Sequence, residues 1–440
     1  MRFIAVIVRF IIYLRWEMPE SSKSKKLWNK DFFLLWQGQL IAELGNAAFT
    51  AVLGFWVLDM TESKALMGLI LACFALPRVL FGPFAGAFAD RANKKLIIIF
   101  SDLMRGLFFL AMGLVFITKV FPFGIIYPFA LFISFFGSFF NPAINSAIPE
   151  IVSKENLTKA NSARGVSQTL SSLVGLALGG LIYSLIQTPI YMKGPVFFVF
   201  TGFTYVYEAI SQIFIKMPHV KNTNVEEKHI LKEMVIGFQY SWRNTGIKIL
   251  LITGMFISFF VTVGVTLLQP LFRDTPGFGT ARYGFTMGLL MAGSITGMLI
   301  LSLFKLKSRS RFFYYRLATF LMIGCMLVGG TTHSFAVITV LVFIAGLCNS
   351  FVAVFTQTVL HITVPQDTRG KVFGIKDAMI DALAPFAMAL SGIAAEFLSV
   401  RPTIIGAFSL AAVAVLPSLF SKTFCGYMNS EETIHHLENV

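Results

Sequence analysis

The sequence has few charged residues for its length. Only 13% of the 440 residues are Asp, Glu, Lys or Arg, whereas 56% are hydrophobic, and the mean hydropathy is +0.75. A water-soluble chain of this size could not hide so much apolar surface in one core. The scarcity of charge therefore excludes a soluble globular protein and predicts a polytopic membrane protein.

Cysteine and catalytic motifs are also scarce. The four cysteines, Cys73, Cys325, Cys348 and Cys425, are widely separated and show no CxxC or His-linked spacing, which argues against a disulfide framework and a metal site. The chain contains no nucleotide-binding P-loop, no HExxH motif and no GxSxG motif. We therefore expect neither an enzyme nor an ATP-driven pump, and we expect no cofactor.

Long hydrophobic runs are what the sequence has instead. Apolar runs of about 20 residues recur along most of the chain without strand-like alternation, so we predict an all-α polytopic membrane protein. It has twelve transmembrane helices in two halves of six. The predicted spans are 33–58, 64–89, 96–118, 124–147, 163–187 and 195–216 in the first half, then 247–272, 280–304, 312–330, 335–361, 372–399 and 403–421.

A polar segment, residues 217–246, is the long interior linker and divides the chain into two bundles, 33–216 and 247–421. A leader, 1–32, precedes them and a tail, 422–440, follows. The leader holds a short apolar run flanked by arginines, which indicates an interfacial segment or a start that lies outside the mature chain. An ungapped shift of 216 residues superposes several glycine, proline and basic positions of the two bundles, which indicates duplicated halves.

Basic residues gather in alternate loops. The formal net charge is +14, and most of the Lys and Arg outside the spans lie in the leader, the linker and the loops after the even-numbered spans. This pattern predicts that those loops, and with them both termini, are cytoplasmic. Because topology explains the charge, we expect no nucleic-acid partner.

The loop between the second and third spans carries Gly86, Asp90, Arg91, Lys94 and Lys95. In a chain of twelve spans, this pattern resembles the loop signature of the major facilitator superfamily, although Asn93 replaces the usual central glycine. The resemblance implies a gating loop. In that interpretation, Gly86 permits close helix approach, and Asp90 helps to hold the cytoplasmic end shut against the eleventh span near residues 370–377.

Other stretches resemble the efflux branch that includes bacterial macrolide and enterobactin exporters. They are Phe-Asn-Pro-Ala at 140–143, Ile-Pro-Glu at 148–150, residues 155–161 and residues 364–374. The fifth span resembles an antiporter signature of close helix packing through Ser171, Gly175, Gly179 and Gly180, with Leu176 where that signature has proline. The resemblance implies a multi-pass protein of the bacterial inner membrane.

Charged residues inside the spans are the candidates for chemistry, since each is costly unless it is paired or faces water. Glu43, Arg78 and Asp381 fall at roughly one depth, about 15 Å from the cytoplasmic ends of their helices. We interpret Glu43 either as a protonatable coupling carboxylate or as a structural partner of Arg78. The two roles are compatible, because protonation would release the pair.

Four further charges are secondary candidates. Asp377 shares a helix face with Asp381, and its place near the start of the predicted span favours a helix-capping role. Asp102 and Arg105, three residues apart, are expected to form a local ion pair. Glu208 has no partner evident in the sequence and lies on a helix that is peripheral in the resembled family, so it ranks below Glu43.

Uncharged polar residues and phenylalanines complete the candidate pathway. Asn141, Asn145, Gln269 and Gln357 either line a substrate route or join helices by hydrogen bonds. The 48 phenylalanines suit a cavity for bulky amphipathic substrates, but contact with the lipid bilayer explains most of them.

We therefore expect a monomeric secondary transporter that works by alternating access. In this hypothesis it exports an amphipathic small molecule, such as a drug, a macrolide or a siderophore-like compound, in exchange for protons. A lipid or lysophospholipid translocator, or an uncoupled facilitator of the same fold, is the alternative. A receptor without transport is a third alternative, which the short linker and tails disfavour.

Overall fold

The computed structural model describes residues 28–217, 230–304 and 307–431. Within these ranges the side chains of residues 83, 87, 90, 91, 154 and 230–234 are not described. Most of the predicted leader, part of the linker and the end of the tail therefore lie outside the described residues.

The first half contains six long helices. They are α2 (Lys30–Thr61), α3 (Lys64–Arg91), α4 (Lys94–Thr118), α5 (Ile126–Ile151), α6 (Leu157–Leu185) and α7 (Ile190–Ile213). The second half contains α9 (Thr245–Asp274), α10 (Gly279–Leu303), α11 (Arg311–Thr331), α12 (Phe335–Thr363), α13 (Gln366–Ala382), α14 (Ala384–Leu398) and α15 (Val400–Leu419). Helices α13 and α14 meet at Leu383 and form one span.

Twelve spans in the described residues are long and apolar enough to cross a membrane, which confirms the prediction of an all-α polytopic protein with two six-helix halves. Two short helices lie outside the spans, α8 (Ile230–Arg243) before α9 and α16 (Lys422–Met428) after α15. Several helices begin where an Asn or Ser side chain accepts a backbone N–H, as at Asn29, Ser63 and Asn244.

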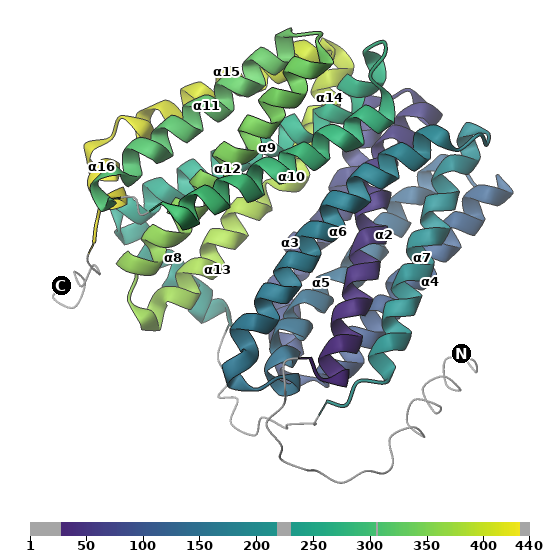
Figure 1. The fold of residues 1–440 in the computed structure, drawn as a ribbon, viewed down its shortest axis with the longest axis horizontal. Coiled ribbons are helices and arrows are strands. Elements are labelled where there is room, and N and C mark those ends of the chain that lie inside the picture. The colour runs from purple at the N-terminus through teal and green to yellow at the C-terminus, as the bar shows by residue number, and fades with distance from the viewer. Residues whose placement is uncertain (1–27, 218–229, 305–306, 432–440) are drawn as a thin grey trace.

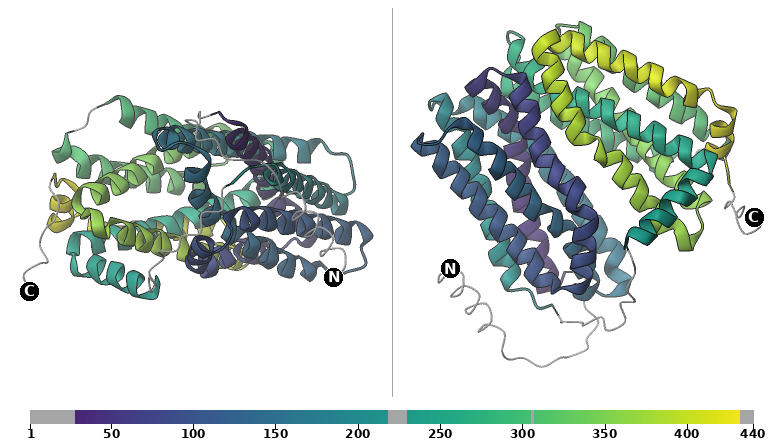
Figure 2. Two further views of the ribbon diagram at one scale, coloured as in Figure 1. Left: turned by 90° about the horizontal axis from the view of Figure 1, so that it is seen from below. Right: turned by 180° about the vertical axis from the view of Figure 1, so that it is seen from behind.

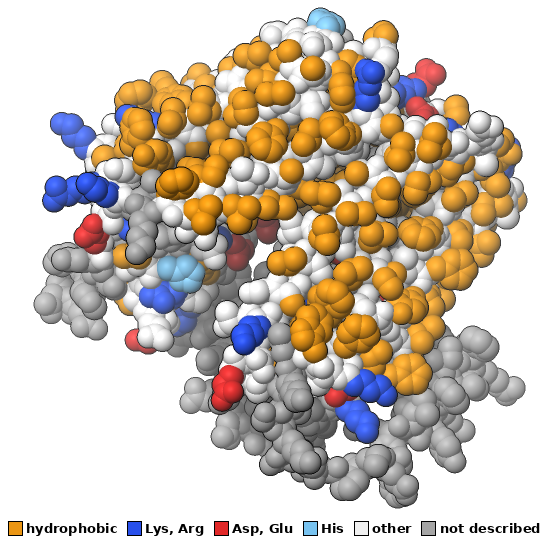
Figure 3. Space-filling view, viewed as in Figure 1, with side chains coloured by type: hydrophobic (Ala, Val, Ile, Leu, Met, Phe, Trp, Pro, Cys, Tyr) orange, Lys and Arg blue, Asp and Glu red, His pale blue; other side chains and the backbone are white. Residues whose placement is uncertain are grey.

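The two bundles meet at one end and diverge at the other (Figure 1). The views from below and behind show the same division, with the first half in purple to blue and the second in green to yellow (Figure 2). Hydrophobic side chains spread over the outer surface of both bundles, and a hollow separates the halves at the divergent end (Figure 3). Such an apolar outer surface fits contact with lipid acyl chains.

Glycines bring the two halves together at the closed end. A Cβ atom on Gly68 of α3 would lie 2.4 Å from the carbonyl oxygen of Met388 and 3.0 Å from Cα of Gly392 in α14. Likewise, a Cβ on Gly180 of α6 would lie 3.1 Å from Cα of Gly284 in α10. Backbones can approach this closely only where side chains are absent, so these contacts fix the halves to each other.

Ion pairs reinforce the closed end. Asp59 of α2 pairs with Arg273 of α9 at 2.9 Å, and Lys64 of α3 pairs with Asp274 at 3.3 Å. The Tyr183 hydroxyl donates to Asp59 Oδ2 (2.7 Å), which ties α6 to the same network. The sequence analysis did not foresee that these charges join the halves.

The open end carries the basic loops, including Lys94 and Arg311. A Cβ atom on Gly86 of α3 would meet no heavy atom within 4 Å, so this glycine makes no close helix contact in the present conformation. The expected contact of Asp90 with the eleventh span stays a prediction, because the side chain of Asp90 is not described. If the basic loops are cytoplasmic, as predicted, the protein is open to the cytoplasm.

The structure corrects the start of the eleventh span. Helix α13 begins at Gln366, six residues before the predicted start, so Asp377 lies in its interior and does not cap it. The apolar run begins later than the helix because the first turns of α13 are polar. The predicted linker also contains structure, since α8 packs on α13 closely enough that a Cβ on Gly237 would lie 2.8 Å from the carbonyl oxygen of Lys371.

Candidate functional site

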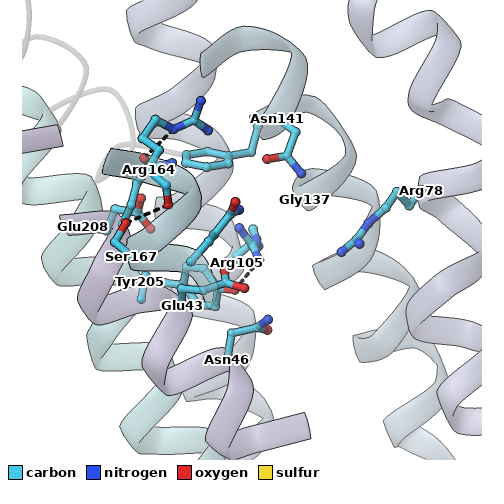
Figure 4. A pocket seen from close by; sticks show the side chains of 14 residues that line it. Glu43, Asn46, Arg78, Arg105, Gly137, Asn141, Arg164, Ser167, Tyr205 and Glu208 are labelled. Atoms are coloured by element: carbon cyan, nitrogen blue, oxygen red, sulfur yellow. Dashed lines mark hydrogen bonds between the residues drawn. The ribbon is translucent and has the colours of Figure 1, made fainter. Parts of the chain in front are cut away.

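A pocket of about 160 Å³ lies inside the first half. Helices α2 to α7 all contribute to its wall, which is made mostly of polar side chains (Figure 4). The charged lining residues are Glu43, Arg78, Arg105, Arg164 and Glu208. A polar site of this size within an apolar bundle is the strongest candidate for the functional centre of the described residues.

Glu43 and Arg78 line the same pocket but do not pair. Glu43 on α2 is half-buried, Arg78 on α3 is exposed, and neither forms an ion pair or hydrogen bond with another described residue. Arg78 reaches in from the opposite wall (Figure 4). The pocket therefore presents a carboxyl group and a guanidinium group, and both are available to a ligand.

Arg105 is held firmly on the inner side of the pocket. Its Nη1 lies 3.3 Å from Asp102 Oδ1, which is the ion pair that the i, i+3 spacing predicted. Its guanidinium also stacks on Tyr205, at 3.9 Å from the ring centroid, and donates to the Tyr205 hydroxyl. Gly137 on α5 leaves room for it, since a Cβ there would lie 3.3 Å from Arg105 Nε.

Glu208 belongs to the same cluster, although the sequence analysis expected it on a peripheral helix without a partner. Helix α7 packs tightly on α4, where a Cβ on Gly106 would lie 3.0 Å from the carbonyl oxygen of Gly202. This packing buries Glu208 to 2% exposure at the edge of the pocket. Tyr205, Glu208 and Gln212 fall at i, i+3 and i+7, a polar stripe that could have revealed the site.

Arg164 is a pocket residue that the sequence analysis missed. Its Nε donates to Gln39 Oε1 and its Nη1 to Asn145 Oδ1, both at 3.1 Å. The sequence analysis did not single it out, although it falls at the start of the predicted span 163–187, and α6 itself begins earlier, at Leu157. Of the two asparagines proposed for the pathway, Asn141 lines the pocket and Asn145 orients Arg164.

Four other candidates lie away from the pocket. Asp381 and Asp377 are exposed on α13 of the second half, and Asp377 pairs with Lys376 at 2.9 Å. The charge of Arg78 still acts on Asp381 as well as on Glu43, so it links the halves electrostatically. Gln357 is exposed on α12, and Gln269 is buried between α9 and α2, where it donates to the carbonyl of Thr50 (3.2 Å).

Lys94 and Lys95, two basic residues of the gating loop, form their contacts within the first half. Lys94 Nζ pairs with Glu150 Oε1 at 2.5 Å, and Lys95 Nζ donates to the carbonyl of Ile213 at the end of α7 (2.7 Å). The side chains of Asp90 and Arg91 lie outside the described residues. The predicted gating role of these residues therefore stays a prediction.

The antiporter-like positions of α6 pack it on two neighbours. Ser171 Oγ donates to the carbonyl of Leu40 in α2 (3.0 Å), and Cβ atoms on Gly175 and Gly179 would lie 2.7 Å or less from backbone or side-chain atoms of α2. Gly180 instead faces α10, as described above. Across the described residues, no three His, Cys, Asp or Glu side chains are grouped to hold a metal ion.

These features define a class of protein, a multi-pass membrane protein with two six-helix halves and a polar pocket inside the first half. The family model of the Major Facilitator Superfamily matches residues 35–387, and the chain belongs to that family.

Curated relatives match over most of their length at low identity. The uncharacterized MFS-type transporter YfiS of Bacillus subtilis (strain 168) is 26% identical over 84% of this chain and 88% of its own. Macrolide efflux protein A of Streptococcus pyogenes is 24% identical, covering 85% and 91%. The putative bacilysin exporter BacE of Bacillus amyloliquefaciens is 25% identical, covering 83% and 88%.

Solved structures share the fold. A mutant of the nucleoside transporter NupG superposes with a TM-score of 0.69 at 12% identity, covering 88% of this chain and 100% of NupG. A bacterial homologue of the human lysosomal transporter Spinster gives 0.69 at 14% identity, covering 93% and 98%. These likenesses confirm the fold and leave the substrate to be argued from the site.

Proposed function

We propose that the protein exports an amphipathic small molecule from a bacterial cell across its inner membrane, by alternating access and in exchange for protons. The observation that carries the proposal is that Glu43 and Arg78 line one polar pocket and that neither forms an ion pair with another described residue. The names of relatives that export macrolides and bacilysin favour the outward direction.

In the proposed mechanism, the substrate and a proton compete for the Glu43 carboxyl. In the conformation open at the basic end, a substrate with a cationic or hydrogen-bonding group binds beside the Glu43 carboxylate. After the halves rock, a proton from the outside binds Glu43 and displaces the substrate. Because the carboxyl can hold only one of the two, transport of substrate is tied to the return of a proton.

The pocket accounts for the polar part of the substrate. Its volume of about 160 Å³ holds a small polar group and not a whole macrolide. The apolar body of the substrate would extend into the hollow between the halves (Figure 3). An amphipathic molecule is therefore a better match than a uniformly charged one.

The test uses inverted membrane vesicles that contain the full-length protein. A thermal-shift screen of macrolides, siderophores and lysolipids first selects a ligand, since binding to the folded state raises the melting temperature. We expect the wild-type vesicles to accumulate that ligand and to lose it when an uncoupler collapses the proton gradient.

Glu43→Gln should abolish gradient-driven accumulation, whereas Glu155→Gln, an exposed acid in the turn before α6, should leave it unchanged. Wild-type accumulation that survives the uncoupler would refute proton exchange and favour an uncoupled facilitator. Undiminished accumulation by Glu43→Gln would remove this residue from the mechanism.

A further inference from the structure

Two buried carboxyls lie side by side behind the pocket, between α4 and α7. Asp102 is 0% exposed and Glu208 is 2% exposed, and the charge of Asp102 acts on Glu208. Two ionised carboxylates in such a site would repel each other strongly and lose their hydration, so both cannot stay charged without compensation.

The hydrogen bonds distinguish the two acids. Both oxygens of Asp102 accept bonds, Oδ1 from Arg105 Nη1 (3.3 Å) and Oδ2 from Gln212 Nε2 (2.7 Å). Glu208 Oε1, in contrast, has no hydrogen-bond partner among the described residues although it is buried. A carboxylate that is acceptor-only needs donors, which Asp102 has and Glu208 Oε1 lacks.

Unpartnered atoms concentrate at this cluster. Six buried side-chain nitrogen and oxygen atoms in the described residues have no hydrogen-bond partner, and three of them are Arg105 Nε, Glu208 Oε1 and Gln212 Oε1. Glu208 and Gln212 each present an acceptor without a donor, one helical turn apart on α7. A proton on Glu208 would convert one of these acceptors into a donor.

The charges around Glu208 can be counted helix by helix. Asp102 and Arg105 face it from α4, Glu43 from α2 and Arg164 from α6, with Tyr205 on its own helix. Arg105 pairs with Asp102, and three carboxyls, Asp102, Glu208 and Glu43, act on it. Arg164 also acts on Glu208, but its guanidinium donates to two amide oxygens and, among the described residues, forms no hydrogen bond with Glu208. Glu208 therefore has cations in its surroundings but no donor at Oε1, and this missing hydrogen bond distinguishes it from Asp102.

We propose that Asp102 and Glu208 form a proton-binding site inside the first half, in which Glu208 carries the proton and Asp102 remains ionised. The only chemical step is the addition of one proton from water to the Glu208 carboxylate. Arg105 is the positioning residue that links this site to the pocket, because it contacts Asp102 and also lies on the pocket wall with Glu43. Loss of the proton would draw Arg105 toward Glu208 and away from Glu43.

The functional meaning of this site rests on the proposed proton exchange, but the site itself can be tested without a substrate. Full-length protein with carboxyl-¹³C-labelled glutamate, reconstituted in lipid, is studied by infrared spectroscopy. The label separates the C=O stretch of protonated glutamic acid from lipid ester bands. We expect the wild type to show a labelled protonated-acid band at neutral pH.

Three variants locate the band. Glu208→Gln should abolish it at neutral pH, whereas Glu155→Gln should retain it. Asp102→Asn should also lose it at neutral pH, because Arg105 is then free to pair with an ionised Glu208, but the band should return on acidification. The Asp102→Asn sample contains Glu208, so it reports on the site even if Glu208→Gln folds poorly.

The outcomes separate this inference from the proposed function. A neutral-pH spectrum without a protonated glutamic acid, or a band that Glu208→Gln leaves intact, would overturn the inference whatever the transport assay gives. If the band behaves as expected but efflux ignores the proton gradient, the site stands and the exchange mechanism fails.

Discussion

Asn93 occupies the loop position where the resembled signature has glycine, and it has a structural role of its own. The Leu96 N–H donates to Asn93 Oδ1 (3.3 Å), so this side chain caps the N-terminus of α4. Asn is among the best N-cap residues and Ala among the poorest. We expect Asn93→Ala to lower the free energy of unfolding by about 1 kcal/mol, and Asn93→Gly by only a few tenths of a kcal/mol.

Thermal unfolding of the purified variants in one detergent would measure the effect of Asn93. The order expected for the melting temperatures is wild type, then Asn93→Gly, then Asn93→Ala. Equal values for wild type and Asn93→Ala would mean that the cap contributes nothing.

At the residue scale, the sequence revealed some members of the site and concealed others. Glu43 and Arg78 stand out because a charge within an apolar run is visible without a structure. Glu208 is also an ionisable residue in a span, but its place in the site depends on which face of α7 packs against α4. Arg164 was overlooked because it stands at the very start of the predicted span 163–187, next to a basic loop.

At the scale of helices, glycine contacts decide which surfaces touch. Gly106 of α4 has almost no free space, since a Cβ there would lie 2.8 Å from Val206 Cγ2, whereas a Cβ on Gly324 of α11 would meet nothing within 4 Å. We expect Gly106→Ala to destabilise the protein by about 1–3 kcal/mol through overpacking. It should also disturb the bond between Gln212 and Asp102.

The matched control is Gly324→Ala, which should be neutral or stabilise the protein by up to about 1 kcal/mol, because Ala favours the helix. Both variants are compared by thermal unfolding. Equal effects of the two substitutions would show that the close contact of α4 with α7 does not limit stability.

Helix α3 and the eleventh span carry glycines at both ends. Gly86 follows Gly68 by eighteen residues, which is five turns, so both lie on one face of α3. Gly374 precedes Gly392 by the same distance, and the two spans run antiparallel. Neither Gly86 nor Gly374 has an atom within 4 Å of its Cβ position, whereas Gly68 and Gly392 are in contact.

We therefore predict that Gly86 meets Gly374 when the basic end closes. In a background whose four native cysteines are replaced by serine, the pair Gly86→Cys with Gly374→Cys should cross-link only in the state closed at that end. The pair Asp59→Cys with Arg273→Cys should cross-link in the conformation described here. Simultaneous cross-linking of both pairs in one molecule would contradict alternating access.

The helices themselves were well predicted from the sequence because hydrophobic runs of sufficient length leave few alternatives in a membrane. Their number and grouping into halves were correct. The starts of α6 and α13 were placed too late, since their first turns are polar and extend beyond the apolar run. The amphipathic α8 was hidden in a segment that appeared to be a linker.

At the scale of the whole molecule, the two ends differ in chemistry. The closed end is held by Asp59 with Arg273 and Lys64 with Asp274, each pair joining the two halves. Partly exposed ion pairs contribute roughly 0.2–1 kcal/mol each, so removing one should change the ratio of the two conformations by only about 1.4- to 5-fold.

We expect Asp59→Asn to raise the outward-open population. An Asn46→Cys probe on the pocket wall should become more reactive toward a membrane-impermeant thiol reagent added from the outer side. Arg273→Gln should act in the same direction, and the double variant should add little to either single change. Fully additive effects would show that the two residues do not act as a pair.

The contact between Gly68 and Gly392 has a mechanical consequence. Helix α3 extends about 27 Å from Gly68 to Gly86, so each degree of rotation about that contact moves the Gly86 end by about half an ångström. The contact is thus the pivot about which α3 rotates. A small rotation at the closed end becomes a large displacement of the other end of the helix. A bulky residue in place of Gly68 would therefore change how far the Gly86 end of α3 moves more than it would change the affinity of the protein for a ligand.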